Sequence, residues 1–158
     1  MEYYENIRGK FKIIDDSIDY YMVMAESSIY YLKKYDNYYD KCFVQYSMFL
    51  EEEFRVKEDI KERNFAEYLR YLFYNEYNID YIYKLIDRCN GIFNFDIVIA
   101  RLLFPSYYFY YLEKGINNNS FDGLKRVIDK TSEYEKYLSL IAEKMNSFLV
   151  KKIVLPFW

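Results

Sequence analysis

The sequence predicts a mainly α-helical, single-domain protein with one small β-hairpin. Its 158 residues are about the length of one domain, and 53% of them are hydrophobic, which is enough to form a buried core. Hydrophobic residues recur at helical spacing along most of the chain, whereas they alternate with a period of two only near residues 42–57. Together these observations predict about five helices packed into one compact domain over residues 1–158.

The first helix is expected to begin after residues 15–17, Asp-Asp-Ser, because such a cluster is typical of a helix N-cap. From Ile18 to Tyr35 the apolar residues follow helical spacing, and the Asp-Asn pair at 36–37 is expected to end the helix. Residues 11–14, Phe-Lys-Ile-Ile, are expected to form a short strand or a loop leading into this helix.

The hairpin is expected over residues 42–57. Side chains alternate with a period of two from Cys42 to Leu50 and again from Phe54 to Lys57, and three Glu residues separate the two stretches. This period indicates strands, although the connection lacks the Asn-Gly or Asp-Gly pair that marks tight hairpin turns. A helix through the same residues is the competing interpretation.

Four further helices are predicted downstream from apolar stripes of helical period. They span residues 62–74, 80–89, 96–113 and 121–149. Asn78 is expected to cap the second of these, and the Asn-Gly pair at 90–91 is expected to end it. Pro105 is expected to break or kink the third, because proline removes a helical hydrogen bond. Gly115 and the Asn residues 117–119 predict a loop before the last helix.

Composition excludes several classes of site. The chain has no His, which excludes Ser-His-Asp and Cys-His catalysis and zinc sites that use His. Cys42 and Cys89 are too few for a disulfide framework, and both are expected to pack in the core. The net charge of -3 argues against a nucleic-acid binder. Because no apolar run is long enough to span a membrane, we expect no membrane partner and a cytoplasmic location.

Aromatic residues make up 23% of the chain, with 22 Tyr and 13 Phe. Stacking on bases or glycans is one interpretation. We favour the bias of an AT-rich genome, because the codons of Tyr, Phe, Ile, Lys and Asn are AT-rich and all five residues are abundant here. The aromatic content therefore carries little functional information by itself.

Three segments carry a family resemblance. Residues 64–72 (NFAEYLRYL), 78–92 and 101–109 (RLLFPSYYF) follow one another in a set order. In that order they resemble a helix after the metal-binding segment, the next helix and its turn, and a Leu-x-Phe-Pro signature of the CotS-like spore-coat kinases. These kinases are relatives of the aminoglycoside phosphotransferase and choline kinase group. The resemblance covers about residues 15–150, all of it kinase C-lobe, and no N-lobe is present. Its outer helices would be 18–32, before the catalytic loop, and 121–148, the last one.

The departures from this family concern its catalytic machinery. The best match to the catalytic loop is the segment Cys-Phe-Val-Gln-Tyr at 42–46. On this resemblance Phe43 stands where the family has His, Gln45 where it has the catalytic Asp, and Leu50 where it has the metal-binding Asn. A neutral amide cannot act as the general base, and Leu50 offers no oxygen to Mg²⁺. Residues 54–59 contain no counterpart of the Asp-Phe-Asp metal segment.

The resemblance therefore implies a degenerate, pseudokinase-like remnant without enzymatic activity, cofactor or metal. Its function would be protein–protein interaction with an unidentified protein or with a second copy. The resemblance also implies the spore coat of a bacterium as a location. Two alternatives stay open. One is a helical regulatory or host-interaction module of phage, viral or immunity type without kinase ancestry, which a fold lacking the hairpin at 42–57 would favour. The other is half of a split nucleotide-binding enzyme, against which Gln45 and Leu50 argue, because a partner chain cannot restore them.

The Tyr-rich run at 107–111 and the apolar C-terminus are the candidate partner-binding segments. The run is apolar on every side as a helix, so a buried core helix explains it as well as a partner surface does. The acidic residues at 51–53, with Glu58, Asp59 and Glu62, are interpreted as a solvated turn rather than a metal site. The candidate partner-binding residues are Tyr107, Tyr108, Tyr110, Tyr111, Phe157 and Trp158.

Overall fold

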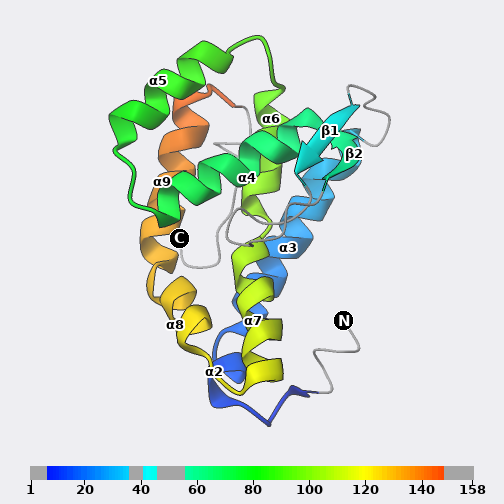
Figure 1. The fold of residues 1–158 in the computed structure, drawn as a ribbon, viewed down its shortest axis with the longest axis vertical. Helices are drawn as coiled ribbons and strands as arrows, with labels where there is room; N and C mark the ends of the chain where they lie inside the picture. The colour runs from blue at the N-terminus through cyan, green and yellow to red at the C-terminus, as the bar shows by residue number, and fades with distance from the viewer. Residues whose placement is uncertain (1–6, 36–40, 46–55, 148–158) are drawn as a thin grey trace.

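The structure is a computed structural model that describes the backbone of residues 7–35, 41–45 and 56–147, and the side chains of residues 7–35 and 59–147. It is mainly helical, as predicted. The elements are α2 (Lys12–Asp15), α3 (Ile18–Leu32), the 3₁₀ helix η1 (Lys33–Tyr35), β1 (Lys41–Gln45), β2 (Val56–Ile60), α4 (Lys61–Tyr74), α5 (Ile79–Cys89), α6 (Phe95–Leu103), α7 (Ser106–Asn118), α8 (Asp122–Asp129) and α9 (Thr131–Lys144) (Figure 1).

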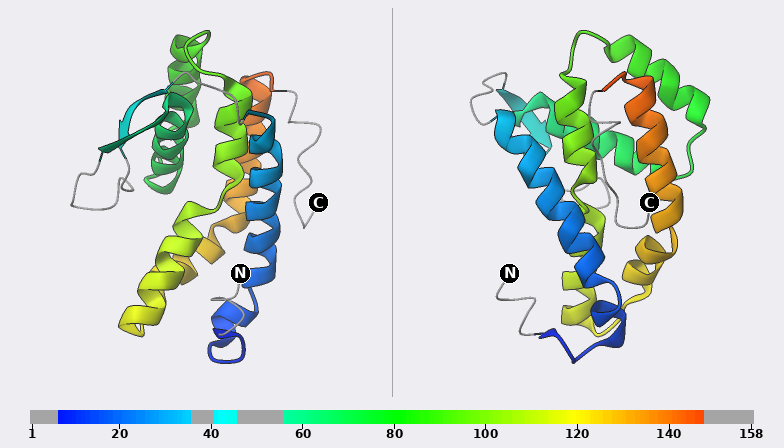
Figure 2. Two further views of the ribbon diagram at one scale, coloured as in Figure 1. Left: turned by 90° about the vertical axis from the view of Figure 1, so that its right-hand side faces the viewer. Right: turned by 180° about the vertical axis from the view of Figure 1, so that it is seen from behind.

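Helices α6 and α7 run one after the other along the long axis of the molecule, with α3 on one side and α8 and α9 on the other (Figure 1). Helix α4 and the two strands lie in front of this layer, as the side view shows (Figure 2). Helix α6 packs against both α3 and α4. It is therefore the central helix, which explains why Val98, Ile99, Ala100 and Leu102, on all sides of it, are fully buried.

The predicted hairpin strands are present as an antiparallel pair. Lys41 lies opposite Ile60 and Gln45 lies opposite Val56. The second strand continues directly into α4, which begins at Lys61, so its bounds lie later than the pattern indicated. The predicted connection at 51–53, and the residues 46–50 and 54–55 that were predicted to extend the strands, lie outside the described residues.

Two of the predicted helices are each divided in two. The predicted break at Pro105 is confirmed, because α6 ends at Leu103 and α7 begins at Ser106. The predicted helix 121–149 is instead α8 and α9, which was not expected. At their junction the Thr131 hydroxyl donates a hydrogen bond to the Ile128 carbonyl at 2.7 Å, a local bond that competes with the helical pattern.

The predicted loop at Gly115 is wrong, because α7 continues through it and turns only at Asn119, which has a left-handed φ of 51°. A Cβ at Gly115 would lie 2.4 Å from the Phe121 ring, so glycine is required there by packing and not by a turn. Residues 11–14 form neither a strand nor a loop, since α2 begins at Lys12. The cap at Asn78 is confirmed: its side chain accepts a hydrogen bond from the Asp80 N–H at 2.7 Å.

The Asp-Asp-Ser cluster does not cap α3 with a side chain. The Ser17 hydroxyl donates instead to the Ile13 carbonyl at 2.7 Å, and Asp15 accepts from the Gly9 N–H at 2.9 Å. The Ser17 bond stabilises the turn from α2 into α3, and the Asp15 bond ties the segment before α2 to the end of that helix. The prediction placed the start of α3 correctly but assigned the wrong partners to the polar side chains.

Candidate functional site

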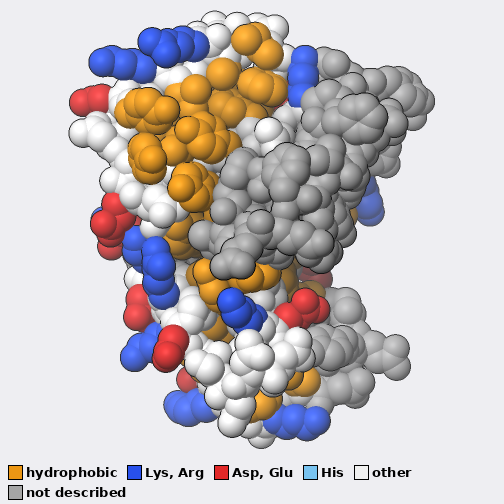
Figure 3. Space-filling view, in the orientation of Figure 1, with side chains coloured by type: hydrophobic (Ala, Val, Ile, Leu, Met, Phe, Trp, Pro, Cys, Tyr) orange, Lys and Arg blue, Asp and Glu red, His pale blue; other side chains and the backbone are white. Residues whose placement is uncertain are grey.

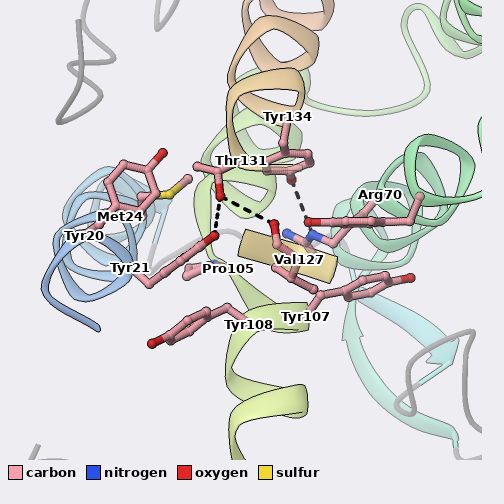
Figure 4. Close-up of a pocket in the computed structure, with 11 residues that line it drawn as sticks. Tyr20, Tyr21, Met24, Arg70, Pro105, Tyr107, Tyr108, Val127, Thr131 and Tyr134 are labelled. Carbon is pink, nitrogen blue, oxygen red and sulfur yellow. Dashed lines mark hydrogen bonds between the residues drawn. The ribbon is translucent and has the colours of Figure 1, made fainter. Parts of the chain in front are cut away.

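A small cavity lies where α3, α4, α7, α8 and α9 meet, and we call it the tyrosine cavity (Figure 4). Its volume is about 10 Å³, which is about the space of one water molecule. Six of its lining side chains are tyrosines. The lining residues are Tyr20, Tyr21, Met24, Arg70, Tyr74, Pro105, Tyr107, Tyr108, Val127, Thr131 and Tyr134.

Helix α3 closes one side of the tyrosine cavity through ring stacking and hydroxyl contacts. The Tyr21 ring stacks on that of Tyr108, with 3.8 Å between the ring centroids and an interplanar angle of 12°. The Tyr21 hydroxyl lies 2.5 Å from the Thr131 hydroxyl. The Tyr108 hydroxyl lies 2.9 Å from the Ser17 hydroxyl. These contacts join α3, α7 and the start of α9, which are far apart in the sequence.

Arg70, on α4, closes the opposite side and is 1% exposed. Its guanidinium donates to the Glu67 carboxylate at 2.5 Å and to the Ser106 hydroxyl at 3.0 Å. It also donates to three carbonyls at the end of α6, those of Arg101 (3.0 Å), Leu102 (3.3 Å) and Phe104 (2.7 Å). The last carbonyls of a helix have no i+4 partner within it, and Arg70 supplies one donor to each of these three at the break before Pro105.

Burial sets the protonation states around the tyrosine cavity. It raises the pKa of Tyr21 to about 12. The pKa of Arg70 would be lowered by burial alone, but the Glu67 carboxylate raises it above its usual value. Burial also raises the pKa of Tyr20, Tyr74, Tyr107, Tyr134 and Tyr137. The phenols are therefore neutral donors and Arg70 is a cation at neutral pH, which suits a structural hydrogen-bond network.

A second, larger pocket lies beside the tyrosine cavity, and we call it the Arg126 pocket. Its volume is about 60 Å³, and it is lined by Tyr74, Asn75, Tyr107, Tyr111, Arg126 and Val127. Arg126 donates a hydrogen bond to the Tyr74 carbonyl, the last of α4, at 3.0 Å. Asn75 and Arg126 are exposed, so the pocket opens to solvent between α4 and α8.

The predicted partner-binding run contributes to both pockets: Tyr107 lines both of them, Tyr108 lines the tyrosine cavity and Tyr111 lines the Arg126 pocket. Tyr107 and Tyr108 are 2% and 0% exposed, so they follow the core interpretation. Tyr110 and Tyr111 are half-buried, and the Lys114 ammonium lies 5.7 Å from the Tyr110 ring centroid. The other two candidates, Phe157 and Trp158, lie outside the described residues.

Sequence reasoning missed a group of tyrosines on the surface of α4, α5 and the turn between them, which we call the α4–α5 patch. It comprises Tyr68, Tyr71, Tyr77 and Tyr81. Tyr77 and Tyr81 are each 47% exposed, and their ring centroids are 5.7 Å apart. A hydrogen bond with Tyr81 raises the pKa of Tyr68 to about 12. Hydrophobic side chains gather over these helices in Figure 3. The i, i+4 spacing of Tyr77 and Tyr81 was the available signal.

The other candidate residues are placed as follows. Gln45 is the last residue of β1, and Leu50 lies outside the described residues. Cys89 is half-buried against the core, and burial raises its pKa, so its environment fits the expected packing role in part. Cys42 lies in β1, where its side chain is not described.

The solvated-turn interpretation is wrong for Glu62 and Asp59. Glu62 is buried and accepts a hydrogen bond from the Asn94 N–H at 2.9 Å. Asp59 accepts from Arg63 at 3.1 Å, and the N–H of Ile60 and Arg63 together lower its pKa although burial alone would raise it. No group of acidic or cysteine side chains suited to a metal ion is present among the residues that the structure describes.

Comparison with protein-family models, curated proteins and solved structures found no significant match to this chain. Within the described ranges, none of the helices is both long and apolar enough to cross a membrane. The fold and the site thus define a mainly α-helical protein whose central polar network is built from tyrosines and one buried arginine.

Proposed function

We propose that the chain is a non-catalytic protein-interaction domain, the degenerate C-lobe of a CotS-like kinase. The observation that carries the proposal is the β1–β2 pair after α3, with Gln45 at the end of β1. In the family that this chain resembles, that position holds the catalytic Asp. A neutral amide there cannot accept the proton of an attacking hydroxyl.

The order of elements supports this proposal over a helical module without kinase ancestry. A long helix (α3), an antiparallel strand pair, and then α4 and α5 follow one another as the resemblance requires. A module of the alternative kind has no reason to contain a strand pair at this point. The split-enzyme alternative is disfavoured, because a second chain could not replace Gln45.

The α4–α5 patch supports the interaction part of the proposal. Tyrosine is enriched at protein interfaces, because it buries a large apolar ring and keeps a hydroxyl for hydrogen bonds. Tyr77, just before α5, and Tyr81, in its first turn, have such rings, which are about half exposed and lie side by side. This surface replaces the run at 107–111, of which the first two tyrosines are buried.

Two experiments test the two parts of the proposal. Isothermal titration calorimetry with Mg-ATP is expected to give no binding heat for the purified chain. ATP binding in the micromolar range, or phosphoryl transfer to a small alcohol, would overturn the non-catalytic part.

For the interaction part, the photo-crosslinking residue benzoylphenylalanine replaces Tyr81 in the cell that makes the protein. Tyr30 is the matched control position, because it is 65% exposed but lies on α3, away from the patch. We expect one defined adduct from position 81 and none from position 30. A dimer adduct in the purified chain would identify the partner as a second copy, and equal adducts from both positions would contradict the patch assignment.

A further inference from the structure

The Arg126 pocket has the size of a small polar group. Its volume is about 60 Å³. A single water needs about 10–15 Å³ measured in this way, and an apolar cavity of about 150 Å³ accepts benzene. The pocket is therefore too large for one water and too small for an aromatic ring. It fits a group of about four non-hydrogen atoms.

The polar groups that line the Arg126 pocket are mainly donors. Arg126 has five N–H donors and no acceptor, and its one hydrogen bond to the described residues runs from Nη2 to the Tyr74 carbonyl. The Tyr107 hydroxyl is buried and has no hydrogen-bond partner within the part of the chain that the structure describes. Because burial raises the pKa of Tyr107, the hydroxyl keeps its proton and needs an acceptor.

The pocket also has apolar walls. The Tyr74 ring stacks on the Tyr107 ring, with 4.7 Å between centroids, and the buried Val127 lines the pocket beside them. A short aliphatic group can lie against these walls while an oxygen acceptor faces Arg126. An exposed rim at Asn75 and Arg126 leaves an entrance from solvent.

We propose that the Arg126 pocket binds the carboxylate group of a short organic acid. A carboxylate with one or two attached carbons matches the volume, and its single charge matches the single guanidinium. It also supplies the acceptor that the Tyr107 hydroxyl lacks. This binding does not depend on kinase ancestry, so it stands or fails separately from the proposed function.

The test is an NMR titration of the labelled full chain with sodium propionate, with sodium chloride at equal ionic strength as the reference. We expect saturable shifts of the Val127 methyl groups and the Arg126 Nε–H. Arg126→Gln is expected to weaken binding roughly tenfold or more, since a charge-assisted hydrogen bond is lost. Tyr107→Phe removes one oxygen atom and is expected to weaken binding several-fold. Lys125→Gln, an exposed neighbour on α8, is the matched control and is expected to leave binding unchanged.

Two sources of the carboxylate are distinguished in the same titration. A tripeptide of alanine with a free carboxyl end is compared with its amide. Tighter binding of the free peptide than of propionate identifies a chain end as the ligand, and tighter binding of propionate identifies a free acid. The absence of saturable shifts with both probes would overturn the proposal. So would binding that either pocket variant leaves unchanged, or that Lys125→Gln weakens equally.

Discussion

The tyrosine cavity and the α4–α5 patch are both rich in tyrosine, but they differ in burial and in the hydrogen-bond partners of the hydroxyls. In the cavity, rings from α3, α4, α7 and α9 line one space together with Arg70, and the hydroxyls of Tyr21, Tyr108 and Tyr134 have hydrogen-bond partners in other segments. In the patch, Tyr77 and Tyr81 lie about half exposed beside each other. The same side chain therefore packs in the core in one region and lies at the surface in the other.

The difference teaches that the hydroxyl matters where water is excluded. A buried hydroxyl or guanidinium without a partner costs the free energy of its desolvation, whereas an exposed one exchanges its partner for water. Changes in the tyrosine cavity should therefore lower the free energy of unfolding, and the same changes in the α4–α5 patch should not. Three measurements test this contrast, and a fourth tests a close helix contact outside both regions.

The largest effect is expected from Arg70→Met. The substitution keeps an apolar stem of similar length but removes the cation that pairs with Glu67 and one donor of each carbonyl at the end of α6. Loss of one partner of a buried ion pair costs about 3–5 kcal/mol. Urea denaturation followed by circular dichroism measures the change. The exposed Arg88→Met on α5 is the control, expected to change stability by less than about 0.5 kcal/mol, and equal effects of the two would refute a structural role for Arg70.

Alkaline pH is expected to destabilise the cavity next. Burial raises the pKa of Tyr21 to about 12, against about 10 for an unfolded tyrosine. The folded chain thus holds this proton more tightly, so its stabilising contribution is complete below pH 10 and is lost as the pH rises to 12. Tyr21 alone accounts for roughly 2–3 kcal/mol of that loss. Urea midpoints between pH 8 and 12 measure it.

Tyr21→Phe should flatten this pH dependence. We expect the cavity tyrosines to ionise only as the helices unfold. Absorbance at 295 nm measures the ionisation, and circular dichroism measures the unfolding. Ionisation of Tyr21 near pH 10 with the helices intact would contradict the predicted order of events.

Gly123→Ala tests the close contact of α7 and α8 and is expected to cost about 1–3 kcal/mol. The added Cβ would lie 2.3 Å from Cδ1 of the Tyr111 ring, so the ring or the helix must move. Thermal unfolding measures the loss. Lys125→Ala on the same helix is exposed and is the control. Equal melting temperatures for the wild type and Gly123→Ala would show that the contact is not tight.

Tyr134→Phe and Tyr81→Phe compare the two regions directly and give the smallest effect. The buried Tyr134 hydroxyl donates to the Leu102 carbonyl at 2.7 Å, and its loss is expected to cost about 1–2 kcal/mol. Loss of the Tyr81 hydroxyl removes its hydrogen bond with Tyr68 at the surface, where water replaces it, at a cost below about 0.5 kcal/mol. Chemical denaturation of both variants checks this, and a larger loss from Tyr81→Phe would reverse the assignment of the two regions.

Local patterns in the sequence predicted most of the fold. The helical spacing from Ile18 onward, the cap at Asn78 and the break at Pro105 each depend on residues within one or two turns, and all three are confirmed. The alternation near 42–57 likewise predicted the strand pair. The split between α8 and α9 was missed, because a helical stripe continues through it and only the Thr131 hydroxyl marks the junction.

The candidate site was much less predictable. The run at 107–111 was recognised as either core or surface, but the sequence could not divide it into buried Tyr107 and Tyr108 and half-buried Tyr110 and Tyr111. Arg70 and Glu62 carried no signal of burial, since charged residues are usually exposed. Gly115 looked like a loop residue, although its role is to admit the Phe121 ring.

By itself the sequence determined a helical chain with one strand pair and a catalytic repertoire without histidine, because periodicity and composition act locally and need no knowledge of the partner surface. Only the tertiary structure decided which tyrosines line the tyrosine cavity and which lie on the α4–α5 patch. The contacts that make this choice join α3 to α7 and α9, as in the pairs Ser17–Tyr108 and Tyr21–Thr131. Such contacts depend on how the helices pack in three dimensions, and no spacing along the chain encodes them.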